Sequence, residues 1–302
     1  MLHVVHQPAY VFPATPGSRF RFDKYGLVME ALRESGVAFT QHQPDPMPRA
    51  WIEAVHDPAY VEEITSLTVP REKERRIGFP VSDRVRLRSM LSPGGTWAAA
   101  RLAIAHGYAA NSAGGSHHAL YDTGAGYCVF NDLAIAAHRL IAEGDARRIL
   151  ILDLDVHQGD GTAALLAGRP EIFTLSLHAE KNFPVRKAHS TLDIALPDGT
   201  GDDAYMVALM EVLPDTLDRF APDLILYQAG VDVHGDDRLG RLALTDGGID
   251  ARDRAVMRAA RVRGVPVAST VGGGYGEDRM AVARRHVACM IALAEEAGLL
   301  RQ

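Results

Sequence analysis

The chain has 302 residues, of which 47% are hydrophobic, and a formal net charge of −6. This length suits one large α/β domain, expected over residues 1–302, and the negative charge argues against a dedicated nucleic-acid binder. Because no apolar run reaches about 18 residues, no membrane span is expected. Two cysteines and an N-terminus without a secretory pattern favour a cytoplasmic protein.

Short apolar runs alternate with helical patterns along the chain, which predicts a parallel sheet covered by helices on both faces. The stretches 8–23, 41–49 and 69–86 are the least regular, and the charged run 71–76 is expected to be solvated surface. In chain order, the pattern predicts strand 2–6, helices 25–35, 58–67 and 96–105, strand 109–111, helix 132–142, strand 149–155, helix 161–166, strand 172–177, helix 205–220, strand 224–229, helix 250–261, strand 265–271 and helix 280–293.

The most informative segment is Ile149-Leu-Ile-Leu-Asp-Leu-Asp-Val-His157. It begins as a strand buried on both faces, and it places Asp153, Asp155 and His157 at alternate positions, so their side chains should leave one face. Burying two like charges is costly unless a cation offsets them. The pattern therefore favours a divalent metal at the carboxyl edge of the sheet over a purely structural Asp-His network.

Four other segments have the composition of strand-to-loop junctions. Asp232 follows an apolar strand, and Tyr275 follows the glycine run 272–274, where backbone could approach a ligand closely. The doublet His117-His118 follows two glycines, and the glycine loop 124–131 leads into a helix. Taken singly, a histidine doublet can be incidental and a glycine run can be a plain tight turn.

Taken together and in this order, these motifs resemble the histone deacetylase superfamily, which includes acetylpolyamine amidohydrolases and acetoin-utilisation proteins. The resemblance implies a single-domain, three-layer arginase/deacetylase-like α/β fold with a central, mostly parallel sheet of eight strands. Segments 155–158, 235–240 and 252–254 look most similar to the class IV branch and its bacterial relatives. The motifs lie at 19–25, 56–60, 114–119, 126–132, 153–161, 176–178, 229–240 and 272–275.

The resemblance also implies roles for individual residues. Asp155, His157 and Asp232 would bind zinc, or iron(II) in the cell, and leave an open coordination position. The expected catalytic residues are the acid-base pair His117 and His118, their orienting carboxylates Asp153 and Asp160, and the oxyanion donor Tyr275. Substrate would contact Gly126, Tyr127 and Gly273, and a structural K⁺ or Na⁺ would lie near Asp153, Ser176 and Leu177.

The function implied is zinc-dependent hydrolysis of N-acyl-lysine in proteins, with acyl groups from acetyl to fatty-acyl. Hydrolysis of acetylpolyamines or similar small acyl-amines is the alternative substrate class. Many family members carry a rim aspartate that anchors the substrate backbone, and only Asp83 is near that position here. Two other hypotheses stay open: an arginase-like hydrolase with two manganese ions, and a non-catalytic acyl-lysine or acyl-polyamine binding protein.

Overall fold

The structure is a computed structural model that describes residues 1–13 and 20–300. Its centre is one eight-stranded sheet in the order β2-β1-β3-β8-β7-β4-β5-β6, and all neighbouring strands are parallel. The expected α/β architecture is therefore confirmed. The strands are β1 (Leu2–Val5), β2 (Phe39–His42), β3 (Tyr108–Asn111), β4 (Ile149–Asp153), β5 (Ile172–Ala179), β6 (Leu192–Leu196), β7 (Leu224–Gly230) and β8 (Val267–Gly272).

The two strands that the sequence pattern missed are the edges of the sheet. Strand β2 reads Phe-Thr-Gln-His and strand β6 reads Leu-Asp-Ile-Ala-Leu, and both are largely half-buried or exposed. The other six strands are almost entirely buried, and their sequences are mostly apolar. Edge strands contact the core on fewer sides, which leaves room for polar residues and weakens the apolar signal.

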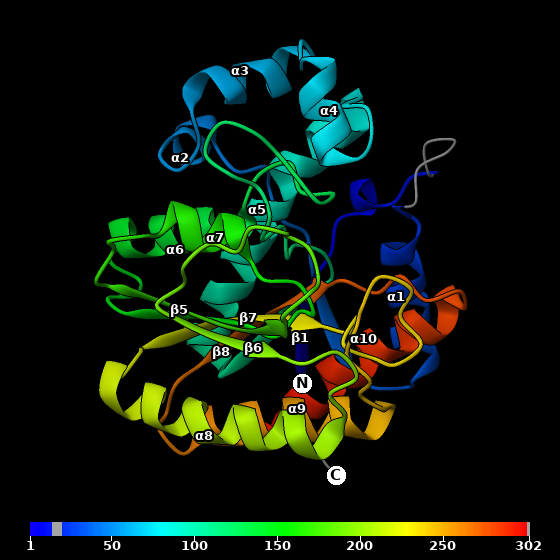
Figure 1. Cartoon of the computed structure of the whole chain (residues 1–302), viewed down its shortest axis with the longest axis vertical. Coiled ribbons are helices and arrows are strands. Elements are labelled where there is room, and N and C mark those ends of the chain that lie inside the picture. Colours follow the sequence, from blue (N-terminus) through cyan, green and yellow to red (C-terminus); the bar gives the residue numbers. More distant parts are fainter. Residues whose placement is uncertain (14–19, 301–302) are drawn as a thin grey trace.

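Helices cover both faces of the sheet. They are α1 (Lys24–Glu34), α2 (Arg49–Glu53), α3 (Pro58–Ser66), α4 (Arg71–Ile77), α5 (Asp83–His106), α6 (Asp132–Glu143), α7 (Asp160–Leu165), α8 (Asp202–Phe220), α9 (Asp246–Arg261) and α10 (Arg279–Glu296). Figure 1 shows α5, α6 and α7 on one face, α8, α9 and α10 on the other, and α2, α3 and α4 beyond the first layer. None of the described helices combines the length and the apolar character that crossing a membrane requires.

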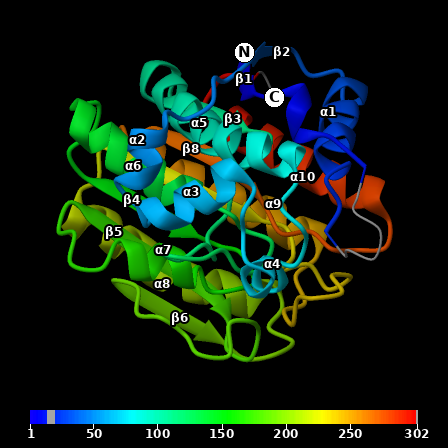
Figure 2. The same ribbon diagram turned by 90° about the horizontal axis from the view of Figure 1, so that it is seen from above.

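The two ends of the described chain meet beside the first strand. Figure 2 places both termini close together at one side of the molecule. The Met1 ammonium group donates a hydrogen bond of 2.6 Å to the Leu299 carbonyl oxygen. This contact brings the end of the last helix back to the start of the sheet.

Helix α5 is longer than the pattern predicted, because a Pro-Gly-Gly segment argues locally against helix. Proline and glycine cost about 3 and 1 kcal/mol inside a helix. Tertiary contacts account for the two glycines: a Cβ atom on Gly94 would lie 2.1 Å from the Asp45 carbonyl oxygen, and one on Gly95 would lie 2.4 Å from the Tyr10 hydroxyl. Packing of neighbouring chain segments against this helix thus outweighs local propensity.

Two other expectations about local structure are wrong. The stretch 69–86, expected to be irregular, contains helix α4, which the Gly78 backbone ends in a left-handed conformation, while the charged run 71–76 is exposed or half-buried as expected. Strand β4 ends at Asp153, two residues earlier than predicted. Asp155 and His157 therefore do not share a strand face with Asp153, and their approach depends on the loop that follows β4.

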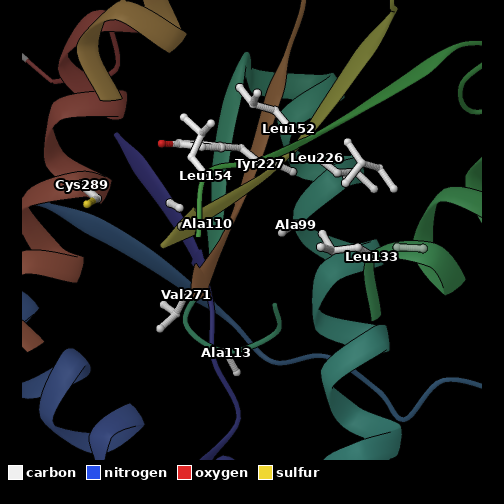
Figure 3. Packing of buried hydrophobic residues seen from close by; sticks show 14 of the residues in the cluster. Ala99, Ala110, Ala113, Leu133, Leu152, Leu154, Leu226, Tyr227, Val271 and Cys289 are labelled. Atoms are coloured by element: carbon white, nitrogen blue, oxygen red, sulfur yellow. The ribbon is translucent and has the colours of Figure 1, made fainter. Parts of the chain in front are cut away.

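The core fills the spaces between the sheet and its helices. Leu152 in β4 and Leu226 in β7 are fully buried, and Figure 3 shows them with Ala99 of α5 and Leu133 of α6 nearby. Burying one such leucine contributes about 1.5–3 kcal/mol relative to leaving it exposed. This packing holds the carboxyl ends of β4 and β7 in place, and the functional residues follow these ends.

The buried His56 lies between α2 and α3, contacts the loop before α6 and should make the stability of the fold sensitive to acid. Its Nδ1 contacts the Leu120 carbonyl oxygen at 2.8 Å, and its Nε2 accepts from the Asn131 backbone N–H at 2.9 Å. Those partners suit the neutral ring with its proton on Nδ1. Burial lowers the pKa of His56 to about 4.

We expect the free energy of unfolding to fall as pH decreases from about 6.5 to about 4, because in this range the unfolded chain binds a proton that folded His56 does not. The contribution of this side chain amounts to about 3 kcal/mol at most. Urea unfolding at several pH values should show that the free energy of unfolding depends less steeply on pH in His56→Gln than in wild type. The exposed His189→Gln variant is the control and should follow wild type.

Candidate active site

Three predicted metal ligands meet at the carboxyl edge of the sheet. Asp155 and His157 lie in the loop after β4, and Asp232 lies just after β7. One ligand atom from each falls within 4.8 Å of the others, and all three residues are buried. His157 Nδ1 is 3.0 Å from Asp155 Oδ1 and 3.3 Å from Asp232 Oδ2.

The donor set fits a divalent cation. Asp232 Oδ2 is buried without a hydrogen-bond partner, which is costly for a carboxylate oxygen unless a cation or proton approaches it. Burial opposes a charged imidazole, yet the hydrogen bond to Asp155 and the charges of the nearby Asp155 and Asp232 carboxylates raise the pKa of His157 to about 10. This position therefore attracts positive charge, and two carboxylates with one imidazole suit zinc or iron(II).

The two tandem histidines each pair with a separate buried carboxylate. His117 and His118 lie in the loop between β3 and α6. His117 Nδ1 is 2.7 Å from Asp153 Oδ2, and His118 Nδ1 is 2.6 Å from Asp160 Oδ1, at the first residue of α7. These contacts orient both rings through Nδ1. Both imidazoles line the cavity that holds the metal-binding group.

The surroundings of the two histidines shift their pKa values in opposite directions. Burial works to lower the pKa of His117, but the charges of Asp153 and Asp155 raise it to about 9. Burial and the neighbouring His117 charge lower the pKa of His118 well below its ordinary value. Burial also raises the pKa of Asp160 to about 6. Two adjacent groups with pKa values pushed apart can serve as an acid and a base in one site.

Two glycines allow the backbone to pack closely against residues of the site: Gly273 against Asp232 and Gly126 against the His118 ring. A Cβ atom on Gly273, whose φ is +60°, would lie 2.0 Å from Asp232 Oδ2, and one on Gly126, whose φ is +53°, would lie 2.6 Å from His118 Cδ2. The chain then presents Tyr275, whose ring centroid is 5.8 Å from that of Tyr127. Burial and the Asp232 and Asp155 charges raise the pKa of Tyr275 well above its usual range, so its hydroxyl remains a donor.

A fully buried arginine on α9 supports the ligands from behind. Arg252 Nη1 donates to the Gly230 carbonyl oxygen at 2.7 Å and to the Leu154 carbonyl oxygen at 3.3 Å. Leu154 directly precedes Asp155, and Gly230 ends β7 two residues before Asp232. One side chain thus holds together the two segments that carry the metal-binding group.

The site opens into a cavity of about 390 Å³. The cavity brings together the metal-binding group, both histidines, Gly126, Tyr127, Gly273 and Tyr275. Its lining also includes four basic residues: Lys24, Arg75, Arg76 and Arg88. Asp153 and Asp160 contact the histidines from outside this lining.

Comparisons with known proteins place the chain in one family. A model of the histone deacetylase domain matches residues 18–291. The chain belongs to this family. An uncharacterized protein of Picosynechococcus sp. is 45% identical over 94% of this chain and 95% of its own length. Histone deacetylase 2 of Arabidopsis thaliana is 31% identical over 85% of this chain and 69% of its own length.

The same three-layer fold occurs in a solved structure. The crystal structure of acetylpolyamine aminohydrolase from Burkholderia pseudomallei has a TM-score of 0.79, with coverage of 97% of this chain and 99% of that one. At 21% sequence identity this likeness shows the fold alone. The family membership supports hydrolysis of an acyl-amine bond and does not decide the substrate.

In this histone deacetylase family member, Asp83 is not on the cavity lining. It begins helix α5, is exposed, and pairs with Arg86 at 2.9 Å. The exposed Arg75 and Arg76 of α4 border the cavity instead. The motif 19–25 is described only from Phe20 onward, so Arg19 lies outside the described residues.

The predicted monovalent-cation site remains a prediction. Asp153 of β4 and Ser176 of β5 are in register across the sheet, with Leu177 next along β5. The Ser176 hydroxyl lies 3.0 Å from His178 Nδ1.

Sequence reasoning missed several residues of the site. Asp237 accepts the Tyr275 backbone N–H at 2.6 Å and so fixes the start of the tyrosine segment. Phe183 packs edge-on against His118 with ring centroids 4.8 Å apart, and its neighbour Asn182 also borders the cavity. Asp237 belongs to the quoted motif 235–240, which was a usable signal, whereas Phe183 lies in a loop with no local pattern.

Proposed function

We propose that this protein is a zinc-dependent hydrolase that removes acyl groups, from acetyl to fatty-acyl, from N-acyl-lysine in proteins. One observation carries the proposal: a buried Asp-His-Asp group, two carboxylate-paired histidines and a protonated tyrosine share a single cavity. A non-catalytic binding protein would have no need for this combination. One hydrolysis assay on an acetyl-lysine fluorogenic peptide separates these two hypotheses.

Each residue of the site has a separate role in the proposed reaction. When bound, the metal ion polarises the amide carbonyl and lowers the pKa of water. One histidine of the pair His117 and His118 takes the water proton, and the pair later protonates the leaving amine, so no covalent intermediate forms. Tyr275 donates to the developing oxyanion. The Gly126 carbonyl accepts the substrate amide hydrogen, and Tyr127 lines the path of the alkyl chain.

The charge of the cavity favours protein acyl-lysine over acetylpolyamines. Lys24, Arg75, Arg76 and Arg88 all line it, and a polyamine carries positive charge at neutral pH. Like charges in a cavity repel across a partly desolvated space. A small-molecule acyl-amine therefore remains the alternative only if it is neutral or acidic.

The metal content separates the deacylase from an arginase-like hydrolase. The described residues contain one group of side chains able to hold a metal, and a two-metal site needs further carboxylates. We expect close to one bound divalent ion per chain after purification, measured by elemental analysis. Two ions per chain would instead support the arginase-like hypothesis.

Substrate preference is tested with acetyl-, octanoyl- and myristoyl-lysine peptides and with acetylputrescine. We expect kcat/KM on the peptides to exceed that on acetylputrescine by about tenfold or more, since repulsion of like charges in such sites is worth more than about 1 kcal/mol. A steady fall from acetyl to myristoyl would remove the fatty-acyl part of the proposal. Activity on acetylputrescine alone would move the protein to small-molecule metabolism.

The location and the single-domain assignment also remain proposals. Cys128 and Cys289 are both free and buried, which suits the reducing cytoplasm. The family match over residues 18–291 is consistent with one catalytic domain over 1–302.

A further inference from the structure

Two buried cations in the cavity have no carboxylate partner among the described residues. Lys24 is 7% exposed and Arg88 is 5% exposed, and both line the cavity that holds the metal-binding group. The Lys24 ammonium donates to the Gly273 carbonyl oxygen at 2.7 Å, and Arg88 Nη2 donates to the Tyr25 hydroxyl. Arg88 Nε has no partner at all in the described part of the chain. Residues 14–19 and 301–302 contain no aspartate or glutamate that could pair with either.

The aromatic rings that both cations contact offset only part of the free-energy cost of burying their charges. Lys24 lies 5.2 Å from the Phe20 ring centroid and Arg88 lies 5.8 Å from it, and both also lie over the Tyr25 ring, at 5.4 and 4.6 Å. A cation over an aromatic face gains less free energy than burial of an ion away from water costs. Buried lysine and arginine side chains are rarely left without an anion. Among the described residues, no carboxylate lies within ion-pair distance of either cation, so a negatively charged group of a ligand could fill that place.

Lys24 lies close to the metal-binding group and to Tyr275, and Arg88 shares the Phe20 and Tyr25 rings with it. Lys24 hydrogen-bonds the carbonyl of Gly273, and a Cβ atom on that glycine would lie 2.0 Å from Asp232 Oδ2. The Lys24 ammonium is also 5.5 Å from the ring centroid of Tyr275. A ligand group that contacts the Lys24 ammonium therefore lies beside Gly273, which packs against Asp232, and beside the ring of Tyr275.

We propose that Lys24 and Arg88 bind a carboxylate at the far end of the acyl group, so that the enzyme prefers dicarboxylic acyl-lysine, such as succinyl- or glutaryl-lysine, over neutral acyl-lysine of equal chain length. This inference rests on the proposed function and narrows its acyl range. The reaction is unchanged: water adds to the amide carbonyl and the C–N bond breaks. The water oxygen stays with the released dicarboxylic acid, and a water proton goes to the lysine amine.

The test compares succinyl-lysine with butyryl-lysine, and glutaryl-lysine with pentanoyl-lysine, on one peptide with the full-length, metal-loaded enzyme. For wild type we expect kcat/KM for the acidic acyl group to exceed that for its neutral partner by about 10- to 100-fold. The free energy of a hydrogen bond to a charged group corresponds to a factor of about this size. Lys24→Met and Arg88→Met should each lower that ratio about tenfold or more. Arg88→Lys keeps the charge and should restore much of the ratio.

Arg238→Met is the matched control, because Arg238 is an exposed cation that pairs with Glu277 at 3.5 Å outside this cavity. Its ratio should equal that of wild type. Direct binding gives a readout independent of turnover: succinate should raise the thermal unfolding temperature of wild type and should raise that of Lys24→Met much less. Butyrate at equal concentration sets the baseline.

The outcomes separate this inference from the proposed function. If no acyl-lysine is hydrolysed, the proposed function fails. If butyryl-lysine is hydrolysed as well as succinyl-lysine, only the carboxylate subsite fails. If the ratio is flat while acetate and succinate inhibit equally, the two cations hold the released carboxylate, and the preference for dicarboxylic acyl groups is overturned.

Discussion

Replacing Asp232 with alanine is expected to abolish both metal retention and hydrolysis. Asp232 supplies one of two carboxylates in the metal-binding group, and its Oδ2 has no hydrogen-bond partner, so a cation is its natural contact. Losing a residue that only orients a ligand costs about 10- to 100-fold in metal affinity, and loss of a ligand itself should cost more. Metal content by elemental analysis and kcat/KM on one acyl-lysine peptide measure the two effects.

Asp236→Ala provides the control for this experiment. Asp236 is a neighbouring carboxylate whose side chain is 74% exposed, and it pairs with Arg285 at the surface. That variant should keep its metal and its turnover. A full complement of metal in Asp232→Ala would show that the ligand assignment is wrong, whatever the activity.

Replacing Tyr275 with phenylalanine is expected to lower kcat about 100-fold or more while the metal stays bound. Removing one oxyanion donor costs about 3 kcal/mol of transition-state stabilisation, and every 1.4 kcal/mol is about tenfold in rate. The ring should keep its place, because Asp237 accepts a hydrogen bond from the Tyr275 backbone N–H. The preceding turn is formed by Gly273 and Gly274, which the substitution leaves unchanged. Steady-state kinetics and metal content on the same sample separate loss of the hydroxyl from loss of the site.

Tyr121→Phe is the matched control, because Tyr121 is 55% exposed and is not part of the cavity lining. It loses the same hydroxyl and should retain wild-type kinetics. Near wild-type turnover in Tyr275→Phe would remove Tyr275 from the mechanism and leave the metal ion as the sole stabiliser of the oxyanion.

The interior of the sheet and most of the metal-binding group could be predicted from the sequence. The run Ile149–Asp153 is buried on both faces, so its apolar composition and its length identify a central strand. Parallel strands end at one edge, so the sequence places the polar residues after β4 and β7 at the same edge of the sheet. The pairing of β4 with β7 in the structure brings them near each other. The resemblance to the family grouped Asp232 with Asp155 and His157, and that assignment did not depend on the predicted end of β4, which was two residues too late.

Only the tertiary structure decided the features that depend on contacts distant in sequence. The edge strands Phe39–His42 and Leu192–Leu196 carry weak local signals, and the start of α5 is helical because packing outweighs its Pro-Gly-Gly segment. Lys24 and Arg88 come from α1 and α5. Lys24 belongs to the motif 19–25, but that motif did not assign the side chain to the cavity, and Arg88 lies in no motif. Their burial without a carboxylate partner arises when the two helices pack around shared aromatic rings, and local composition does not encode that arrangement.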